Sequence, residues 1–201
     1  MKRLLIALCL TALVNPILHA QALTPEDLQR ALKYMEKTRA GVLDATKGLS
    51  AAQWNFKAAT NRWSVAEVAE HIASAEDFLV DMINNQVMKA PARTESVDLK
   101  ALDELVLKQI PDRSNKVQAP EPLRPSNRFG SPKESLKHFQ ESRAKTIQFL
   151  KDTKDLRGHA IDSPLGKKLD GYQWILFIAA HSERHTRQID EVKADPGFPK
   201  K

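Results

Sequence analysis

The chain has 201 residues, with 31 lysines and arginines against 25 aspartates and glutamates, and a formal charge of +6 at pH 7. The basic residues are spread among the acids and form no basic stripe interleaved with aromatic residues, which argues against nucleic-acid binding. A chain of this length predicts one domain with a sizeable core, and most of its charged residues are predicted to lie on solvated helix faces.

The first 22 residues have the layout of a secretory signal peptide: a basic start, a short apolar run and the small-residue ending A-Q-A. The apolar run is interrupted by Asn15 and Pro16 and is a poor membrane span. We therefore predict that residues 1–22 are a signal peptide and that residues 23–201 form the mature domain, which is periplasmic or secreted and is not attached to a membrane. An uncleaved anchor is the alternative.

The only cysteine, Cys9, lies inside the predicted signal peptide. Its position in the middle of the apolar run, away from the cleavage point, argues against a lipoprotein attachment. The mature chain therefore has no thiol nucleophile and no thiolate ligand, and only histidines and carboxylates remain as metal ligands.

Capping signals mark the starts of the first two long helices. Thr24 precedes a proline and two acids, a pattern that predicts a helix running to about Lys47. Ser64 and Glu67 form a capping-box pattern, which predicts a helix that extends to about Met88.

The least regular region is residues 90–131, which five prolines interrupt. One short helix is predicted there, over about residues 99–109. A connection of this length in a compact domain is usually a lid, a crossover or a mobile excursion. It could cover a functional site, or it could be a solvated crossover without a function.

Two further helices are predicted in the C-terminal part. Ser131, followed by a proline and Glu134, starts a helix that ends near Asp152. Residues 154–168 are predicted as a loop, and the last helix spans about residues 170–193. Strand patterns and internal repeats are not evident. The sequence therefore predicts an all-α fold, a four-helix bundle with a long irregular crossover between the second and third main helices.

Two histidines in the last helix are candidate metal ligands. His181 and His185 are four residues apart, so on a helix they share one face and can bind one ion together. On a helical projection both lie in the middle of the apolar stripe of that helix, so they should face the core. That stripe consists of Trp174, Ile178, Ile189 and Val192.

A third histidine, His71, is predicted to lie on the buried stripe of the earlier helix. That stripe consists of Val68, Ala75, Phe78 and Met82. Three inward imidazoles would be costly as unpaired polar groups, and one shared metal would satisfy them together. The alternative is a metal-free core in which each ring hydrogen bonds to the protein. His138 is predicted to be exposed, and His159 to lie in a loop with nothing to orient it.

Two motifs occur in a characteristic order: W-S-V-A-E-V-A-E-H at residues 63–71 and H-S-E-R-H-T-R-Q-I at residues 181–189. In these motifs, and over essentially the whole mature chain, the sequence resembles the DinB-like superfamily, metal-binding four-helix bundles that include thiol-dependent transferases. The resemblance implies a DinB-like bundle in which His71, His181 and His185 are the ligands of a divalent metal.

Three protein ligands and an open position are typical of a catalytic zinc site, and all-nitrogen ligation also suits nickel or Fe(II). The leading hypothesis is a metal-dependent transferase or hydrolase, in which an activated thiol or water attacks a small-molecule substrate. A low-molecular-weight thiol is a candidate partner, although the predicted export makes such thiols less assured. The alternative is a non-catalytic metal-binding bundle or a homodimeric interaction module.

Two further residues are candidates for orienting the imidazoles. Glu67 lies about one turn before His71, and Gln188 lies about one turn after His185, so each could bond to a ring or to a bound ligand. For Glu67 the competing interpretation is its role in the capping box.

Overall fold

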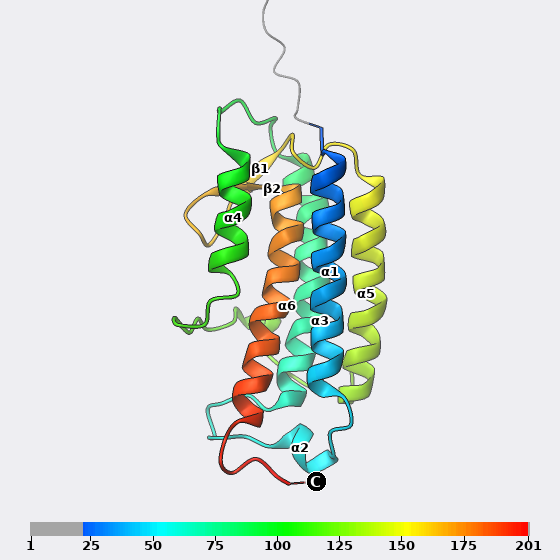
Figure 1. Cartoon of the computed structure of the whole chain (residues 1–201), viewed down its shortest axis with the longest axis vertical. Coiled ribbons are helices and arrows are strands. Elements are labelled where there is room, and N and C mark those ends of the chain that lie inside the picture. The colour runs from blue at the N-terminus through cyan, green and yellow to red at the C-terminus, as the bar shows by residue number, and fades with distance from the viewer. Residues whose placement is uncertain (1–21, 201) are drawn as a thin grey trace, which may run out of the picture.

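Four long helices form the body of the protein in the computed structural model, which describes residues 22–200 (Figure 1). These helices are α1 (Pro25–Thr46), α3 (Val65–Asn85), α5 (Pro132–Asp152) and α6 (Gly171–Lys193). Helix α1 packs mainly against α6, and α3 packs against both α5 and α6. The arrangement confirms the predicted four-helix bundle.

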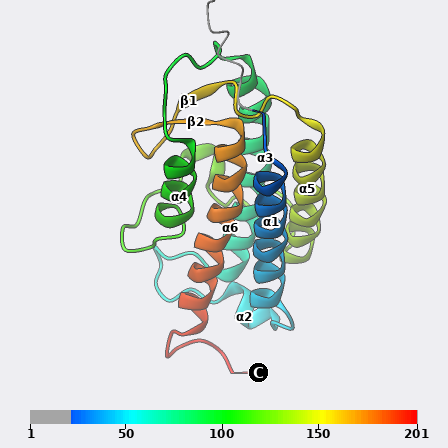
Figure 2. The same ribbon diagram turned by 45° about the horizontal axis from the view of Figure 1, so that its top comes forward.

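Short elements complete the fold at the ends and along one side of the bundle (Figure 2). They are α2 (Ala51–Asn55), α4 (Leu99–Gln109) and the 3-10 turns η1 (Val87–Lys89) and η2 (Glu121–Leu123). Helix α2 lies at one end of the bundle, and α4 packs against α6. Within residues 22–200 there is no helix with both the length and the apolar character needed to cross a membrane.

The directions of α3 and α5 explain the long crossover between them. Helix α3 ends at the top of Figure 1 and α5 begins near the bottom, so the chain must return along the bundle before α5 can start. Residues 86–131 make this return, and α4 lies on the way, beside α6. The predicted crossover is confirmed, and its length follows from two successive long helices that run in the same direction.

Capping side chains confirm the predicted helix starts. The Thr24 hydroxyl accepts the N–H of Asp27 at 3.1 Å at the start of α1. Ser64 and Glu67 form a reciprocal capping box at the start of α3, and Ser131 caps α5. Each of these side chains satisfies a backbone N–H group that the first helical turn leaves without a partner.

A small hairpin corrects the prediction that residues 154–168 form only a loop. Strand β1 (Ala160–Asp162) pairs antiparallel with β2 (Lys168–Asp170). Gly166, between the strands, has a φ of +66°, a conformation that favours glycine. The prediction was wrong because three-residue strands are too short to show a period of two.

A buried arginine joins all four long helices. Arg143 of α5 is fully buried and pairs with Glu76 of α3, with N–O distances of 2.7 and 2.8 Å. Its guanidinium also donates to the Met35 carbonyl and the Thr38 hydroxyl of α1, and to the Ser182 hydroxyl of α6. All five guanidinium N–H donors are therefore used, and the contact with Ser182 fixes α6 directly beside His181.

Candidate metal centre

Three imidazoles from two helices meet between α3 and α6. The Nε2 atom of His71 lies 3.3 Å from Nε2 of His181 and 3.1 Å from Nε2 of His185. The Nε2 atoms of His181 and His185 are 3.1 Å apart. His71 and His185 are buried, whereas His181 is partly exposed. The structure thus brings together the three histidines that the sequence singled out.

The apolar stripes predicted to surround these histidines are largely buried in the structure. The stripe on α6 that holds His181 and His185 is buried along its length. On α3, Val68 and Ala75 are buried beside His71, but Phe78 is 44% exposed, so its prediction as a core residue was wrong. The apolar pattern of α3 does not tell whether another element covers Phe78, and α4, which packs against α6, makes few contacts with α3.

The hydrogen bonds of His71 and His185 fix which ring nitrogen carries the proton. Nδ1 of His71 lies 2.8 Å from the carbonyl oxygen of Leu123, which can only accept a hydrogen bond. Nδ1 of His185 lies 2.8 Å from Oε1 of Gln188, which also accepts from Arg113 at 3.3 Å. Both Nδ1 atoms therefore donate, and the Nε2 atoms carry the lone pairs.

The donor atoms fit a divalent metal. Nε2 of His71 and Nε2 of His185, each without a hydrogen, face one another at 3.1 Å and cannot hydrogen bond with each other. Two nitrogens on one tetrahedral zinc ion would be about 3.3–3.4 Å apart, and about 2.8–3.0 Å apart on an octahedral ion. The three separations fall within this span, so a shared cation would resolve the repulsion between the lone pairs.

Burial lowers the pKa of all three histidines. Desolvation is the largest cause at each ring, and it holds the pKa values of His181 and His185 well below the ordinary value for histidine. Other histidines of the cluster lower these two pKa values further. A nearby arginine also lowers the pKa of each ring: Arg128 that of His71, Arg184 that of His181 and Arg113 that of His185. Neutral imidazole is the form that binds a metal, so the surroundings favour ligation.

One half of the crossover is fixed to α6 beside the site. Arg184, between the two histidines of α6, donates to the carbonyls of Ile110, Asp112 and Asn115. Arg113 donates to both carboxylate oxygens of Glu191, at 2.6 and 2.8 Å. Together with the bond from His71 to Leu123, these contacts hold residues 110–115 and Leu123 beside the site, so part of the long connection lies next to it.

The two residues predicted to orient the rings have different roles. Gln188 bonds to His185, as expected. The carboxylate of Glu67 instead accepts from the Ser64 N–H at 2.7 Å and from Lys57 at 2.8 Å, which corrects the idea that it orients His71. The carbonyl oxygen of Leu123 orients His71 instead. The sequence held no signal for Leu123, because a backbone carbonyl is common to every residue type.

The other two histidines of residues 22–200 lie outside the cluster. His138 is half-buried rather than freely exposed: its Nε2 lies 2.6 Å from Asp77, and its ring stacks on Phe129. His159 is oriented after all, because its Nδ1 donates to the carbonyl of Ala90. Neither belongs to the cluster of convergent donor atoms.

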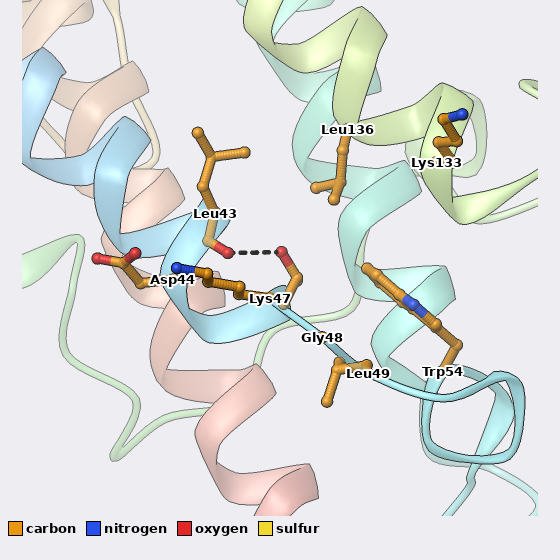
Figure 3. A pocket seen from close by; sticks show the side chains of 9 residues that line it. Leu43, Asp44, Lys47, Gly48, Leu49, Trp54, Lys133 and Leu136 are labelled. Carbon is orange, nitrogen blue, oxygen red and sulfur yellow. Dashed lines mark hydrogen bonds between the residues drawn. The ribbon is translucent and has the colours of Figure 1, made fainter.

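A pocket of about 410 Å³ lies elsewhere, where the end of α1 meets α2 and the start of α5 (Figure 3). Leu43, Leu49, Trp54 and Leu136 give it an apolar lining. Thr46 also lines it, and its hydroxyl donates to the Leu43 carbonyl at 3.1 Å. Because its lining includes no histidine, it is separate from the metal centre.

The fold and the site together define a four-helix bundle with a candidate metal centre of three histidines between two of its helices. The family model of the DinB superfamily matches residues 34–189. The chain therefore belongs to the DinB superfamily, and the resemblance that the two motifs indicated is confirmed.

Two proteins from Bacillus subtilis are similar to this chain. Protein YuaE of strain 168, described as uncharacterized, is 33% identical over 150 residues, which are 73% of this chain and 87% of YuaE. The solved structure of YfiT matches with a TM-score of 0.54 and 17% identity, over 89% of this chain and 93% of YfiT. YfiT is described as a probable metal-dependent hydrolase with an unusual four-helix bundle topology. At this identity the likeness shows the fold alone.

Proposed function

We propose that the protein is a divalent-metal-dependent enzyme, a hydrolase or a thiol transferase, that acts on a small molecule. The observation that carries the proposal is the convergence of three Nε2 atoms while the Nδ1 protons of His71 and His185 are engaged elsewhere. The description of YfiT as a probable metal-dependent hydrolase supports the first of the two activities.

His71, His181 and His185 would hold a divalent metal and leave a coordination position open. The metal would supply Lewis-acid chemistry there, by lowering the pKa of a water, to about 7 for zinc, or by deprotonating a thiol. The protein prepares the site for this chemistry, since Leu123 and Gln188 hold two rings in the tautomer that binds metal. The arginines near the rings favour an anionic nucleophile or substrate. His181 is partly exposed, so its side of the cluster is where a substrate would approach.

Zinc is the metal we propose first, with nickel and Fe(II) as alternatives. Three neutral nitrogen donors suit all three ions, and the donor set contains no thiolate that would select among them. The separations of 3.1–3.3 Å lie between the tetrahedral and octahedral values given above and do not favour one ion.

The location and partners of the protein are part of the proposal. The sequence of residues 1–22 supports export to the periplasm or secretion; residues 1–21 lie outside the part that the structure describes. Water is always available there, whereas a low-molecular-weight thiol is less assured, which favours hydrolysis. We expect neither nucleic acid nor a membrane as a partner, and a homodimer stays a prediction.

The test is an activity screen of the zinc- and nickel-loaded protein against ester, amide and electrophilic model substrates, with and without added thiols. We expect turnover that chelation abolishes, and a requirement for thiol only if the protein is a transferase. The His185→Ala variant should be inactive, whereas His138→Ala, which removes a histidine outside the cluster, should be active. Full turnover by metal-depleted His185→Ala would overturn the proposal, and metal binding without any turnover would favour the non-catalytic bundle.

A further inference from the structure

The carboxylate of Glu70 holds the end of the crossover against α3. Glu70 is 6% exposed, and its oxygens accept the backbone N–H groups of Ser126, Asn127 and Arg128 at 2.8, 2.9 and 3.1 Å. The guanidinium of Arg128 adds an ion pair at 3.4 Å. A carboxylate bonded to three consecutive backbone donors is strongly held, because bonds to an ionised acceptor are stronger than neutral ones. Residues 126–128 are therefore fixed relative to α3.

The same part of the chain carries the carbonyl that orients His71. Leu123 ends η2, and its carbonyl oxygen accepts from Nδ1 of His71 at 2.8 Å. Arg128 connects the two contacts, because its Nη2 donates to the carbonyls of Pro122 and Arg124, on either side of Leu123, at 2.9 and 3.1 Å. The Leu123 carbonyl is thus held by the residues that Glu70 fixes.

We propose that Glu70 is a positioning residue for the metal centre. Its carboxylate fixes residues 126–128 and, through Arg128, the Leu123 carbonyl that keeps the proton on Nδ1 of His71. This rests on the proposed function, in which His71 is a metal ligand. Glu70 and His71 are adjacent in α3, so one helical segment carries both the ligand and the residue that positions its hydrogen-bond partner.

Glu67 offers a matched control for this role. It is the same residue type in the same helix, one turn earlier, and its carboxylate bonds to Ser64 and Lys57 and not to the crossover. The test compares Glu70→Gln with Glu67→Gln in the full chain. Arg128→Gln is a second variant for the case that Glu70→Gln does not fold, because Arg128 is exposed and its loss leaves the bundle core intact.

Three readouts are measured: amide hydrogen exchange of residues 126–128, the nitrogen-15 NMR signal of the His71 ring in metal-free protein, and zinc affinity by competition with a chromophoric chelator. For Glu70→Gln we expect amide exchange faster by about tenfold or more. The Nδ1-protonated signal of His71 should give way to a tautomer average, and zinc affinity should fall by about 10–100-fold. Glu67→Gln should leave all three unchanged, and Arg128→Gln should shift them in the same direction by less.

The outcomes separate this proposal from the proposed function. If Glu70→Gln released residues 126–128 but left the His71 tautomer and the zinc affinity unchanged, the positioning role would be overturned. Unchanged amide exchange would overturn it as well. If the wild-type protein bound no metal, the proposed function would fail, and the metal-free NMR signal of His71 would still decide whether Glu70 positions the ring.

Discussion

Replacing Glu76 with glutamine should destabilise the bundle strongly, because it breaks an ion pair that water does not reach. The side chains of Glu76 and Arg143 are 1% and 0% exposed, and the carboxylate also accepts from the Thr146 hydroxyl at 2.9 Å. The variant leaves a buried guanidinium without a counter-charge. Removing one partner of a buried pair costs about 3–5 kcal/mol, and each kcal/mol lowers Tm by about 2–4 °C at this chain length, so we expect a loss of about 6–20 °C.

Thermal unfolding followed by circular dichroism tests this prediction, with Glu36→Gln as the control. Glu36 also pairs with an arginine, Arg39, at 2.6 Å, but the two side chains are 49% and 37% exposed. The control should therefore lose less than about 1 kcal/mol. The double variant Glu76→Leu with Arg143→Met removes both charges and should be more stable than Glu76→Gln. If Glu76→Gln were as stable as the control, the buried ion pair would not stabilise the bundle in the way proposed.

Three further predictions concern the metal centre. Zinc at about 100 times its Kd should stabilise the wild type by about 2.7 kcal/mol in calorimetry, and a similar gain in His71→Ala would contradict the assigned ligand set. Gln188→Leu should weaken zinc binding by about 10–100-fold in a titration, and unchanged affinity would show that its bond to His185 has no effect. Because the pKa values of His71 and His185 are lowered, the unfolded chain takes up protons first as the pH falls. The stability of the metal-free protein should thus be full above about pH 6.5 and decrease below it, by at most about 1.4 kcal/mol per pH unit per ring, and His185→Ala should show a shallower decrease in denaturant unfolding.

The helices and the inward facing of the histidines could be predicted because the signals that define them are local. A cap at Thr24, Ser64 or Ser131 bonds within one turn, so a few residues determine where the helix starts. The facing of His181 and His185 follows from the apolar stripe of their own helix. Each inference needed only the helical period and the neighbours in sequence.

The other features of the fold and of the site depend on which segments of the chain contact one another in the folded protein. Glu67 and Glu70 are identical in type and lie on the same helix, and only the position of the crossover gives Glu70 its three backbone donors. Phe78 belongs to an apolar stripe, but that pattern does not tell whether another helix covers it. The prediction that most charged residues are solvated did not identify Arg143 and Glu76 as exceptions, because a charged residue in a helix does not reveal a buried counter-charge on another helix.

The most direct test of the metal centre is elemental analysis of the protein purified without added metal, beside His71→Ala and His181→Ala. We expect about one equivalent of zinc, nickel or iron per wild-type chain and a loss of that metal in both variants. If none of the three proteins held metal, even after reconstitution with zinc or nickel, the three histidines would be hydrogen-bonding core residues and the proposed metal-dependent activity would be contradicted.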